Sequence, residues 1–456
     1  MKYQARQIAS ATRGYIISGD PHTWISGIST DTRTIKEGDL FIALRGENFD
    51  GQDFIEKAFA KGACGAVVMD EEIRFPGMII FADDTLVALG DIAAFIRNRY
   101  SPSIVGITGS TGKTTVKEFC ASILSLQGPC LKTMNNFNNL IGVPLSLIEL
   151  GNHHEFAVIE MGTNRFGEID RLSTITRPTV SVLTNINPVH LKGLRTISGI
   201  IREKQSVFKN TTIPGTAVLN PYQEYMDRVS IAEHLSRKTY SMKDKADITL
   251  KKIDYEGLDG SDIIIDIAGT ALQVHVPLPG RHNISNALAA AACACALDID
   301  PEKIAQGIKD AQLPGMRSEI IFSGRITIIN DCYNANPASM KAALEMLSSS
   351  PHVYKVAVLG DMLELGNHAE HWHKELGKWV AQSGISRLIV IGEMAHFIAD
   401  ATVKSGMNAA AVHIAPDMED IFWNLSDMAD KDAIVLVKAS RALRLDLVVN
   451  HLKAVA

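Results

Sequence analysis

The chain has 456 residues, of which 46% are hydrophobic and 21% charged, and its formal net charge is −6. This length predicts two to four domains of an ordinary globular protein, and the negative charge argues against a nucleic-acid partner bound by bulk electrostatics. No apolar stretch reaches about 18 residues and the amino terminus lacks a signal-peptide core, so we expect a cytoplasmic protein without stable membrane insertion. The six scattered cysteines are interpreted as reduced packing thiols.

Residues 1–100 alternate between short apolar runs and helix-like segments. The apolar runs at 39–44 and 65–69 are typical of strands, and the segments at 54–61 and 87–100 are typical of helices. This alternation predicts a small α/β domain that ends at a linker over 101–103.

A glycine-rich turn at 108–115 follows an apolar run at 104–107 and precedes a helix-like segment at 116–124. Strand, turn and helix are the context of a phosphate-binding loop, because backbone N–H groups at the helix start face anionic oxygens. The strict pattern has glycine at 107, where this chain has Ile107, so the loop is a variant, and an ordinary glycine-rich turn is the alternative. We predict phosphate binding by Thr108, Gly109, Ser110, Thr111, Gly112, Lys113, Thr114 and Thr115, with Lys113 reaching the terminal phosphates and Thr114 or Thr115 holding Mg²⁺.

Two further buried strands are predicted at 157–160 and 180–184, and polar residues follow each of them. Ligands collect at the carboxyl ends of parallel strands, so Glu160 is a candidate Mg²⁺ ligand and His190 a weaker candidate. A solvated strand-end glutamate and a surface histidine are the alternatives. Lys204 lies in a predicted amphipathic helix over 200–208, and composition alone predicts that its side chain is a solvated charge.

The remaining segments predict an antiparallel hairpin within 248–276, an alanine-rich helix at 286–297, and further strands at 326–330, 355–360, 387–392 and 434–438. Polar residues at 331–337 and 360–366 follow two of these strands and suit ligand contact, although each stretch could be a plain turn. The amide-rich stretch at 135–139 suits polar substrate recognition or, again, a turn.

Together these stretches resemble the Mur ligase family, the ATP-dependent amino-acid and peptide ligases of bacterial cell-wall precursor synthesis. The resemblance covers essentially the whole chain, and its motifs lie at 29–33, 38–41, 108–115, 138–144, 160–162, 184–190, 280–287, 316–317 and 331–337. It implies an α/β fold of three domains: a small α/β domain for the UDP-sugar peptide at 1–100, a central ATP-binding domain with a P-loop ATPase-like, mostly parallel sheet at 101–313, and a Rossmann-like ligase domain at 314–456.

The resemblance also implies roles for single residues. The catalytic set is Lys113, Glu160, His190 and Lys204. Lys204 matches a lysine that CO₂ carbamylates in the family. Mg²⁺ would be held by Thr114, Glu160, His190 and Lys204. ATP contacts would come from His282, Asn283, Arg317 and Asp331. Substrate contacts would come from Ser29, Thr30, Arg33, Asn138, Asn139, Tyr333, Asn334 and Asn336. Two departures stand out, Ser206 where the family usually has glutamate and Ala439 where glycine is usual.

The motifs at 331–340 and 360–366 resemble the branch of the family that joins D-alanyl-D-alanine to UDP-N-acetylmuramoyl-tripeptide, through an acyl phosphate formed with ATP. The Asp-Asn-Pro-Arg type of motif that marks a sibling branch is missing, since Ala338 follows Asn336-Pro337. Both peptides are therefore the expected substrates of a protein that we expect to be a monomer. The alternatives are a sibling ligase that adds a single amino acid, a more distant folylpolyglutamate synthase, and a phosphate-loop ATPase that does not ligate.

Overall fold

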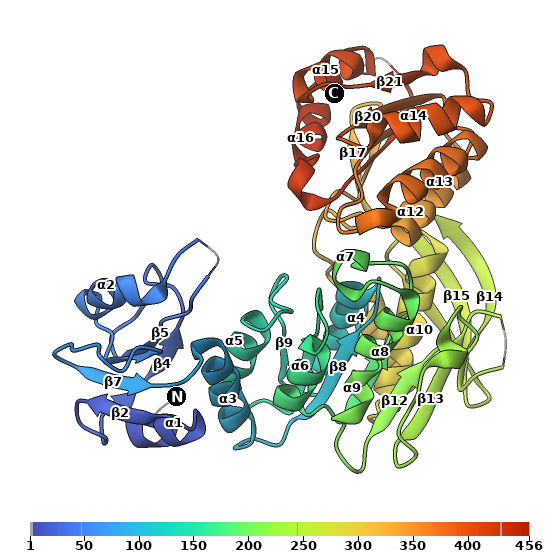
Figure 1. Ribbon diagram of the computed structural model, residues 1–456. Coiled ribbons are helices and arrows are strands. Elements are labelled where there is room, and N and C mark those ends of the chain that lie inside the picture. Colours follow the sequence, from blue (N-terminus) through green and yellow to red (C-terminus); the bar gives the residue numbers. More distant parts are fainter. Residues whose placement is uncertain (1–2, 47, 244, 429–430, 456) are drawn as a thin grey trace.

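The computed structural model describes residues 3–46, 48–243, 245–428 and 431–455, and it has the predicted α/β fold in three domains (Figure 1). The amino-terminal domain holds a five-stranded sheet in the order β2-β7-β6-β5-β4, in which β2 alone is antiparallel to its neighbour. A two-stranded ribbon of β1 and β3 lies beside it. The elements are β1 (Tyr3–Gln4), α1 (Ala5–Ala11), β2 (Tyr15–Ser18), β3 (Trp24–Ile25), β4 (Gly27–Ser29), β5 (Asp39–Ile42), η1 (Gly51–Phe54), α2 (Ile55–Ala60), β6 (Gly65–Val68), β7 (Met78–Phe81) and α3 (Thr85–Arg97).

The central domain is built on a nine-stranded sheet in the order β16-β15-β14-β13-β12-β11-β8-β10-β9. The strands from β9 to β14 pair in parallel, and β14, β15 and β16 form the predicted antiparallel hairpin region. The strands are β8 (Ser103–Thr108), β9 (Cys130–Lys132), β10 (Phe156–Glu160), β11 (Val180–Leu183), β12 (Thr216–Leu219), β13 (Ser236–Ser241), β14 (Ile248–Gly257), β15 (Gly260–Ile267) and β16 (Thr270–Val276).

Helices cover this sheet, and β8 lies in its interior, between β11 and β10. Ile104, Val105 and Ile107 of β8 are fully buried, as expected for a parallel strand that is covered on both faces. Helices α10 and α11 pack on α4, the helix that follows β8. The helices are α4 (Lys113–Ser125), α5 (Gly142–Ile148), α6 (Glu168–Thr176), α7 (Leu191–Leu194), α8 (Ile197–Lys204), α9 (Ser206–Lys209), η2 (Met226–Arg228), α10 (Arg281–Cys295) and α11 (Pro301–Lys309).

The carboxy-terminal domain has a six-stranded sheet in the order β17-β18-β22-β19-β20-β21, parallel except for the edge strand β17. Four of these strands match the four predicted runs, whereas β17 and β21 were not predicted. The elements are β17 (Glu319–Ser323), β18 (Ile326–Asn330), α12 (Pro337–Ser349), β19 (Tyr354–Gly360), η3 (Gly366–His368), α13 (Ala369–Gln382), β20 (Arg387–Ile391), α14 (Ala395–Lys404), η4 (Ala409–Ala411), β21 (Val412–Ile414), α15 (Met418–Leu425), η5 (Ser426–Met428), β22 (Ala433–Lys438), η6 (Arg441–Leu443) and α16 (Asp446–Val455).

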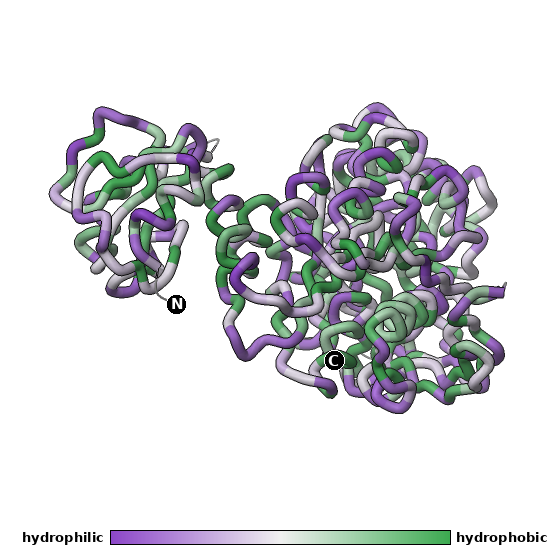
Figure 2. Tube along the Cα trace, turned by 90° about the horizontal axis from the view of Figure 1, so that it is seen from below, coloured by the Kyte–Doolittle hydropathy of each residue, from purple (hydrophilic) through white to green (hydrophobic). Residues whose placement is uncertain are grey.

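The amino-terminal domain forms a separate lobe beside the central domain, as both views show (Figures 1 and 2). Helix α3 joins the two, because it packs on α5 and α6 of the central domain. Asp91 on α3 accepts a 2.6 Å ion pair from Arg171, and the Arg97 Nε donates to the Thr176 carbonyl over 3.0 Å. The boundaries at residues 100 and 313 stay predictions.

None of the helices in the described ranges is long and apolar enough to cross a membrane. The six cysteines are all free, as predicted from their scatter along the chain.

Candidate active site

The predicted phosphate loop connects β8 to α4, and its two glycines are required by the geometry. Gly109 has φ +151° and Gly112 has φ +78°, a region that favours glycine. A Cβ atom at Gly109 would lie 1.9 Å from the Thr184 Oγ1, and one at Gly112 would lie 2.3 Å from the Asn286 Oδ1. The loop therefore folds tightly against the end of β11 and the start of α10.

The segment after β11 fixes the shape of the loop. The Thr111 N–H donates to the Asn185 Oδ1 over 2.9 Å, and the Ser110 N–H donates to the Asn185 carbonyl over 3.0 Å. The Ser110 hydroxyl donates to the Asn187 carbonyl over 3.0 Å. These two loop amides thus have protein partners, whereas the N–H groups in the first turn of α4 lack intrahelical acceptors, an arrangement that suits an anion.

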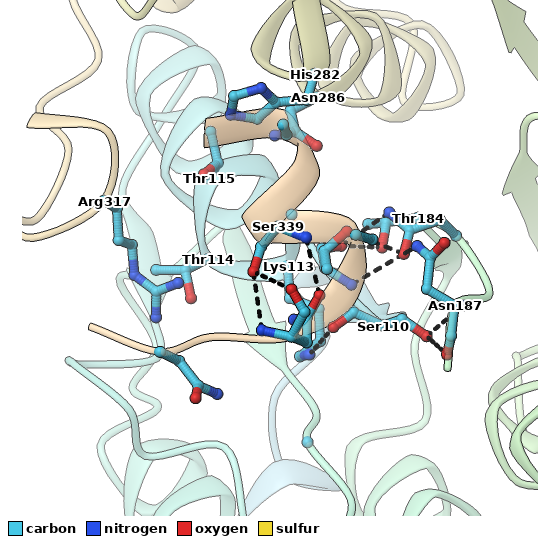
Figure 3. A pocket seen from close by; sticks show the side chains of 18 of the residues that line it. Ser110, Lys113, Thr114, Thr115, Thr184, Asn187, His282, Asn286, Arg317 and Ser339 are labelled. Carbon is cyan, nitrogen blue, oxygen red and sulfur yellow. Dashed lines mark hydrogen bonds between the residues drawn. The ribbon is translucent and has the colours of Figure 1, made fainter. Parts of the chain in front are cut away.

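A cavity of about 560 Å³ lies between the central and carboxy-terminal domains, directly in front of this helix start (Figure 3). Most of the predicted site residues line it, although they come from segments that are far apart in the chain. They are Ser110, Thr111, Gly112, Lys113, Thr114, Thr115, Asn138, Asn139, Glu160, His190, His282, Asn283, Arg317, Asp331, Tyr333, Asn334 and Asn336. The structure therefore brings these predicted residues together in one cavity that both domains line.

Glu160 ends β10 and is 2% exposed, and its carboxylate faces the first turn of α4. The Thr114 hydroxyl donates to its Oε2 over 2.9 Å, and the Asn138 amide donates to its Oε1 over 2.8 Å. No group of three or more His, Cys, Asp or Glu side chains suited to a metal occurs in the described ranges. A hydroxyl beside one carboxylate still fits Mg²⁺, which commonly takes one or two protein oxygens together with phosphate oxygens.

Lys204 is fully buried at the end of α8, and it lies beneath the phosphate loop rather than in solvent. Its Nζ donates to the Gly109 carbonyl over 2.9 Å, and the Nζ of Lys113 donates to the same carbonyl over 2.9 Å. Burial, and then the charge of Lys113, hold the pKa of Lys204 well below its usual value. The interpretation of Lys204 as a solvated charge is therefore wrong, because the fold buries it under the loop.

The neighbouring Glu203 contacts the segment between β10 and α6. Its carboxylate accepts the N–H groups of Gly167 and Ile169, both over 2.7 Å, and the Thr163 hydroxyl over 3.2 Å. Ser206, at the position where the family usually has glutamate, donates its hydroxyl to the Glu203 carbonyl. Glu203 thus fixes the start of α6 and the segment that follows β10.

His190 lies in the segment between β11 and α7, with φ +53°. Its Nδ1 is 2.5 Å from the Oε2 of Glu364, in the loop that follows β19 of the carboxy-terminal domain. Burial lowers the pKa of His190, and the positive charges of Lys204 and Lys113 act in the same direction, whereas Glu364 opposes them. The sequence placed Glu364 in a stretch that could be either a site or a loop, and no role was predicted for this residue.

The carboxy-terminal domain closes the cavity with Arg317, Tyr333 and Asp331. The Arg317 guanidinium stacks over the Tyr333 ring at 3.8 Å from its centroid, and Figure 3 shows the Arg317 side chain among those that line the cavity. The Asp331 Oδ2 forms a 2.6 Å ion pair with the Lys438 Nζ. Lys438 lies at the end of β22, is 2% exposed, and also donates to the Asn334 carbonyl over 2.9 Å. Sequence reasoning assigned no role to Lys438, although a lysine at the end of a predicted buried strand indicates a candidate site residue.

Several predicted contact residues also hold the local backbone. Asn336 caps α12 by accepting the Ser339 N–H over 3.0 Å, and Asn139 accepts the Gly142 N–H over 2.8 Å at the start of α5. Asn283 donates to the Pro279 carbonyl over 2.8 Å at the start of α10. His282, beside it, has its pKa lowered by burial.

Six predicted residues do not line this cavity, and Lys204, buried beneath the phosphate loop, is one of them. Thr108 and Gly109 lie behind its lining at the end of β8, where both help to position the loop. Ser29, Thr30 and Arg33 lie in the amino-terminal lobe, where Arg33 pairs with Asp31 over 2.6 Å and holds the pKa of that carboxyl at about 2. Their role in binding a UDP-sugar stays a prediction.

The sequence matches three family models: "Mur ligase family, catalytic domain" at 24–94, "Mur ligase middle domain" at 107–294 and "Mur ligase, glutamate ligase domain" at 316–441. It is 34% identical to the UDP-N-acetylmuramoyl-tripeptide–D-alanyl-D-alanine ligase of Bacillus subtilis, over 99% of this chain and 98% of the relative. The ligase of the same name from Escherichia coli K12 is 35% identical, over 94% of both chains.

Solved structures agree with these matches. A crystal structure of MurF from Acinetobacter baumannii superposes with a TM-score of 0.93 at 30% identity, over 100% of this chain and 99% of the other. MurF ligase from Thermotoga maritima in complex with ADP superposes with a TM-score of 0.83 at 26% identity, over 94% and 97%. The fold and site are those of a nucleotide-dependent ligase, and the chain belongs to the Mur ligase family. The predicted family and three-domain fold are thereby confirmed.

Proposed function

We propose that this chain is an ATP-dependent ligase that joins D-alanyl-D-alanine to UDP-N-acetylmuramoyl-tripeptide in the cytoplasm, as a step of peptidoglycan precursor synthesis. The main observation in support is that one cavity joins the phosphate loop and Glu160 of the central domain to Arg317 and Asp331 of the carboxy-terminal domain. Full-length relatives with this activity in their names support the choice of substrates.

The chemical problem is that a carboxylate is a poor acyl donor. In the proposed reaction the tripeptide carboxylate attacks the γ-phosphorus of ATP, which breaks the bond to the bridging oxygen and releases ADP. The amine of D-alanyl-D-alanine then attacks the acyl carbon, loses a proton, and expels phosphate as the amide bond forms. Two anions meet in the first step, so catalysis depends on placed cations and alignment rather than on covalent help.

The central domain would hold the phosphates. Lys113 and the N–H groups at the start of α4 would bind the β- and γ-phosphates. Thr114 or Thr115 would hold one Mg²⁺ together with Glu160, and His190 would hold a second together with a carbamylated Lys204. Bound there, the two cations would neutralise charge that develops on the phosphate oxygens. A free Lys204 ammonium would oppose cation binding, whereas its carbamate would favour it.

The carboxy-terminal domain would complete the site. Arg317 lines the same cavity as the phosphate loop, and Asp331 is held at the cavity wall by its ion pair with Lys438. Closure of this wall excludes water, which would otherwise hydrolyse the acyl phosphate. The link before Arg317, at Pro314-Gly315, is the proposed hinge.

The test is to incubate the purified protein with ATP, Mg²⁺, UDP-N-acetylmuramoyl-tripeptide and D-alanyl-D-alanine and to identify products by mass spectrometry. We expect a UDP-N-acetylmuramoyl-pentapeptide together with stoichiometric ADP and phosphate. Parallel reactions that replace the dipeptide with single amino acids distinguish a sibling ligase. Rapid phosphate release without any amine acceptor indicates the alternative, a non-ligating ATPase, and a missing pentapeptide would defeat the proposal.

A further inference from the structure

Glu364 joins the two domains at the point where His190 enters the cavity. Its Oε2 lies 2.5 Å from the His190 Nδ1, and its backbone carbonyl accepts the Lys192 N–H over 3.1 Å. Gly366, two residues on, also packs on α7, where a Cβ atom would be in ordinary van der Waals contact, 3.4 Å from the Lys192 Cα. One short loop of the carboxy-terminal domain thus contacts the backbone and the side chain of the His190 segment.

This loop is held firmly by its own domain. Asp361, buried at its start, accepts the N–H groups of Glu393 and Met394 over 2.8 and 3.1 Å. The Leu363 N–H donates to the Ser440 hydroxyl over 2.9 Å. Glu364 itself has φ +64°, a conformation that costs a side-chain-bearing residue energy and persists only where the surroundings impose it. The backbone that carries the half-exposed Glu364 side chain is therefore held in place by its own domain.

The contact determines which ring nitrogen of His190 can bind a cation. An ionised carboxylate only accepts hydrogen bonds, so the Nδ1 must carry the proton. A neutral imidazole then has its lone pair on Nε2, which is the form that ligates a metal. Metal-binding histidines commonly donate their other N–H to a carboxylate, which fixes the tautomer and the orientation of the ring.

We propose that Glu364 is a positioning residue that holds His190 in its Nδ1–H tautomer, so that docking of the carboxy-terminal domain prepares the Nε2 of His190 for the second divalent cation. The inference rests on the proposed function in assigning a cation to His190. It adds that the carboxylate which supports this ligand belongs to a different domain from the ligand itself. Cation affinity then depends on whether the carboxy-terminal domain is docked.

The test compares Glu364→Ala, Glu364→Gln and, as a matched control, Glu345→Ala, which removes an exposed carboxylate of α12 outside the cavity. The first readout is the tautomer of His190, read from two-bond nitrogen–proton spectra of ¹⁵N-histidine-labelled protein and assigned by the signal that His190→Gln removes. The second is Mn²⁺ affinity in the presence of ADP, measured by electron paramagnetic resonance titration.

We expect wild type to show the Nδ1–H tautomer. Glu364→Ala should lose this preference. It should also bind the second, more weakly held Mn²⁺, which we assign to His190, about 10- to 100-fold less tightly. Glu364→Gln should recover much of both, because its amide oxygen still accepts from Nδ1–H, and Glu345→Ala should match wild type. Unchanged Mn²⁺ affinity in Glu364→Ala overturns the proposal, and so does lost affinity with an unchanged tautomer. Neither readout needs a peptide substrate, so both stay decisive if the protein makes no pentapeptide.

Discussion

Lys204 and Lys113 donate to one acceptor, the Gly109 carbonyl, each over 2.9 Å. Two ammonium groups that share an acceptor repel each other, and Lys204 is fully buried. Its depressed pKa favours the neutral amine, which is the form that reacts with CO₂. This environment therefore favours the reaction of the Lys204 amine with CO₂ to give the proposed carbamate, which is an anion.

The first prediction concerns this lysine. Lys204→Ala should lose most ligase activity, because the proposed second cation loses its anionic ligand, and formate or acetate should restore part of it by entering the vacated space. Phosphate release that depends on both substrates measures the effect. The control is Lys209→Ala, which removes an exposed lysine from the adjacent α9. Full activity in Lys204→Ala would contradict the assignment.

Glu160→Gln should lower the turnover rate roughly 100-fold or more, because a bound cation supplies several kcal/mol of charge stabilisation. The amide can still accept from Thr114, so the fold should stand. A rate that rises again at high Mg²⁺ concentration would show that the lost group binds the cation. The exposed Glu149→Gln, on the neighbouring helix end, serves as the comparison and should leave the Mg²⁺ dependence unchanged.

Gly112→Ala should abolish nucleotide binding. The new Cβ would lie 2.3 Å from the Asn286 Oδ1 at φ +78°, so the loop or the start of α10 must move. Gly384 offers a control for the φ effect alone, since it has φ +65° and a Cβ atom there would meet no atom of the described residues within 4 Å beyond its chain neighbours. Gly384→Ala should cost about 1 kcal/mol of stability and leave ADP affinity intact. Calorimetric titration with ADP separates the two, and equal ADP affinities would refute the role of the close approach.

Lys438→Met should destabilise the carboxy-terminal domain by roughly 3–5 kcal/mol, because it leaves the Asp331 carboxylate without its cation in a mostly buried place. Asp331→Asn in the same chain should recover part of this loss, since the amide carries no charge. Urea unfolding of the two single variants and the double variant gives the coupling energy. Losses that simply add would mean that the 2.6 Å pair contributes little.

The last prediction is a pH dependence that originates at His373. This side chain is fully buried, its Nε2 accepts the Met362 N–H over 3.0 Å and its Nδ1 donates to the Ala369 carbonyl. Burial lowers its pKa below 6.5 in the folded protein. As the pH falls below about 6.5, the unfolded chain binds a proton that the folded chain does not, so the free energy of unfolding decreases.

His373→Gln should therefore flatten the loss of stability between about pH 6.5 and 5, while lowering stability at pH 7.5 through the lost packing. Tryptophan fluorescence during urea unfolding is a suitable measurement, because Trp372 and Trp379 lie on the same helix, α13. The exposed His22→Gln in the amino-terminal lobe should keep the wild-type slope. An unchanged slope in His373→Gln would exclude this histidine as its source.

The sequence predicted those parts of the fold and site that depend on local patterns. The run into the phosphate loop is apolar and continuous because β8 is buried on both faces, and the glycines reflect positive φ and close approach. Short edge strands such as β9 and β21 have only three residues each, too few for a periodic pattern. Their place is set by tertiary pairing instead.

The residues that sequence reasoning missed have their partners far along the chain. Glu364 is separated from His190 by 174 positions, and Lys438 from Asp331 by 107. Neither lies in a motif whose spacing fixes a chemical role, and each gains its meaning only when the sheet order and the domain contact are known. Lys204 shows the same limit, because an amphipathic pattern cannot tell a solvated lysine from one buried beneath a distant loop.

The position of Glu203 next to Lys204 has a consequence for how this segment can change during evolution. Successive helical residues point about 100° apart, so the three bonds of Glu203 set the rotation of α8 and thereby the direction of Lys204. Point substitutions on the outer face of α8 are compatible with this arrangement. A single-residue insertion or deletion between the Thr196 cap and Glu203 would have to be absorbed before the helix, or the lysine would turn away from the loop. Length, more than composition, is therefore the constrained property of this short helix.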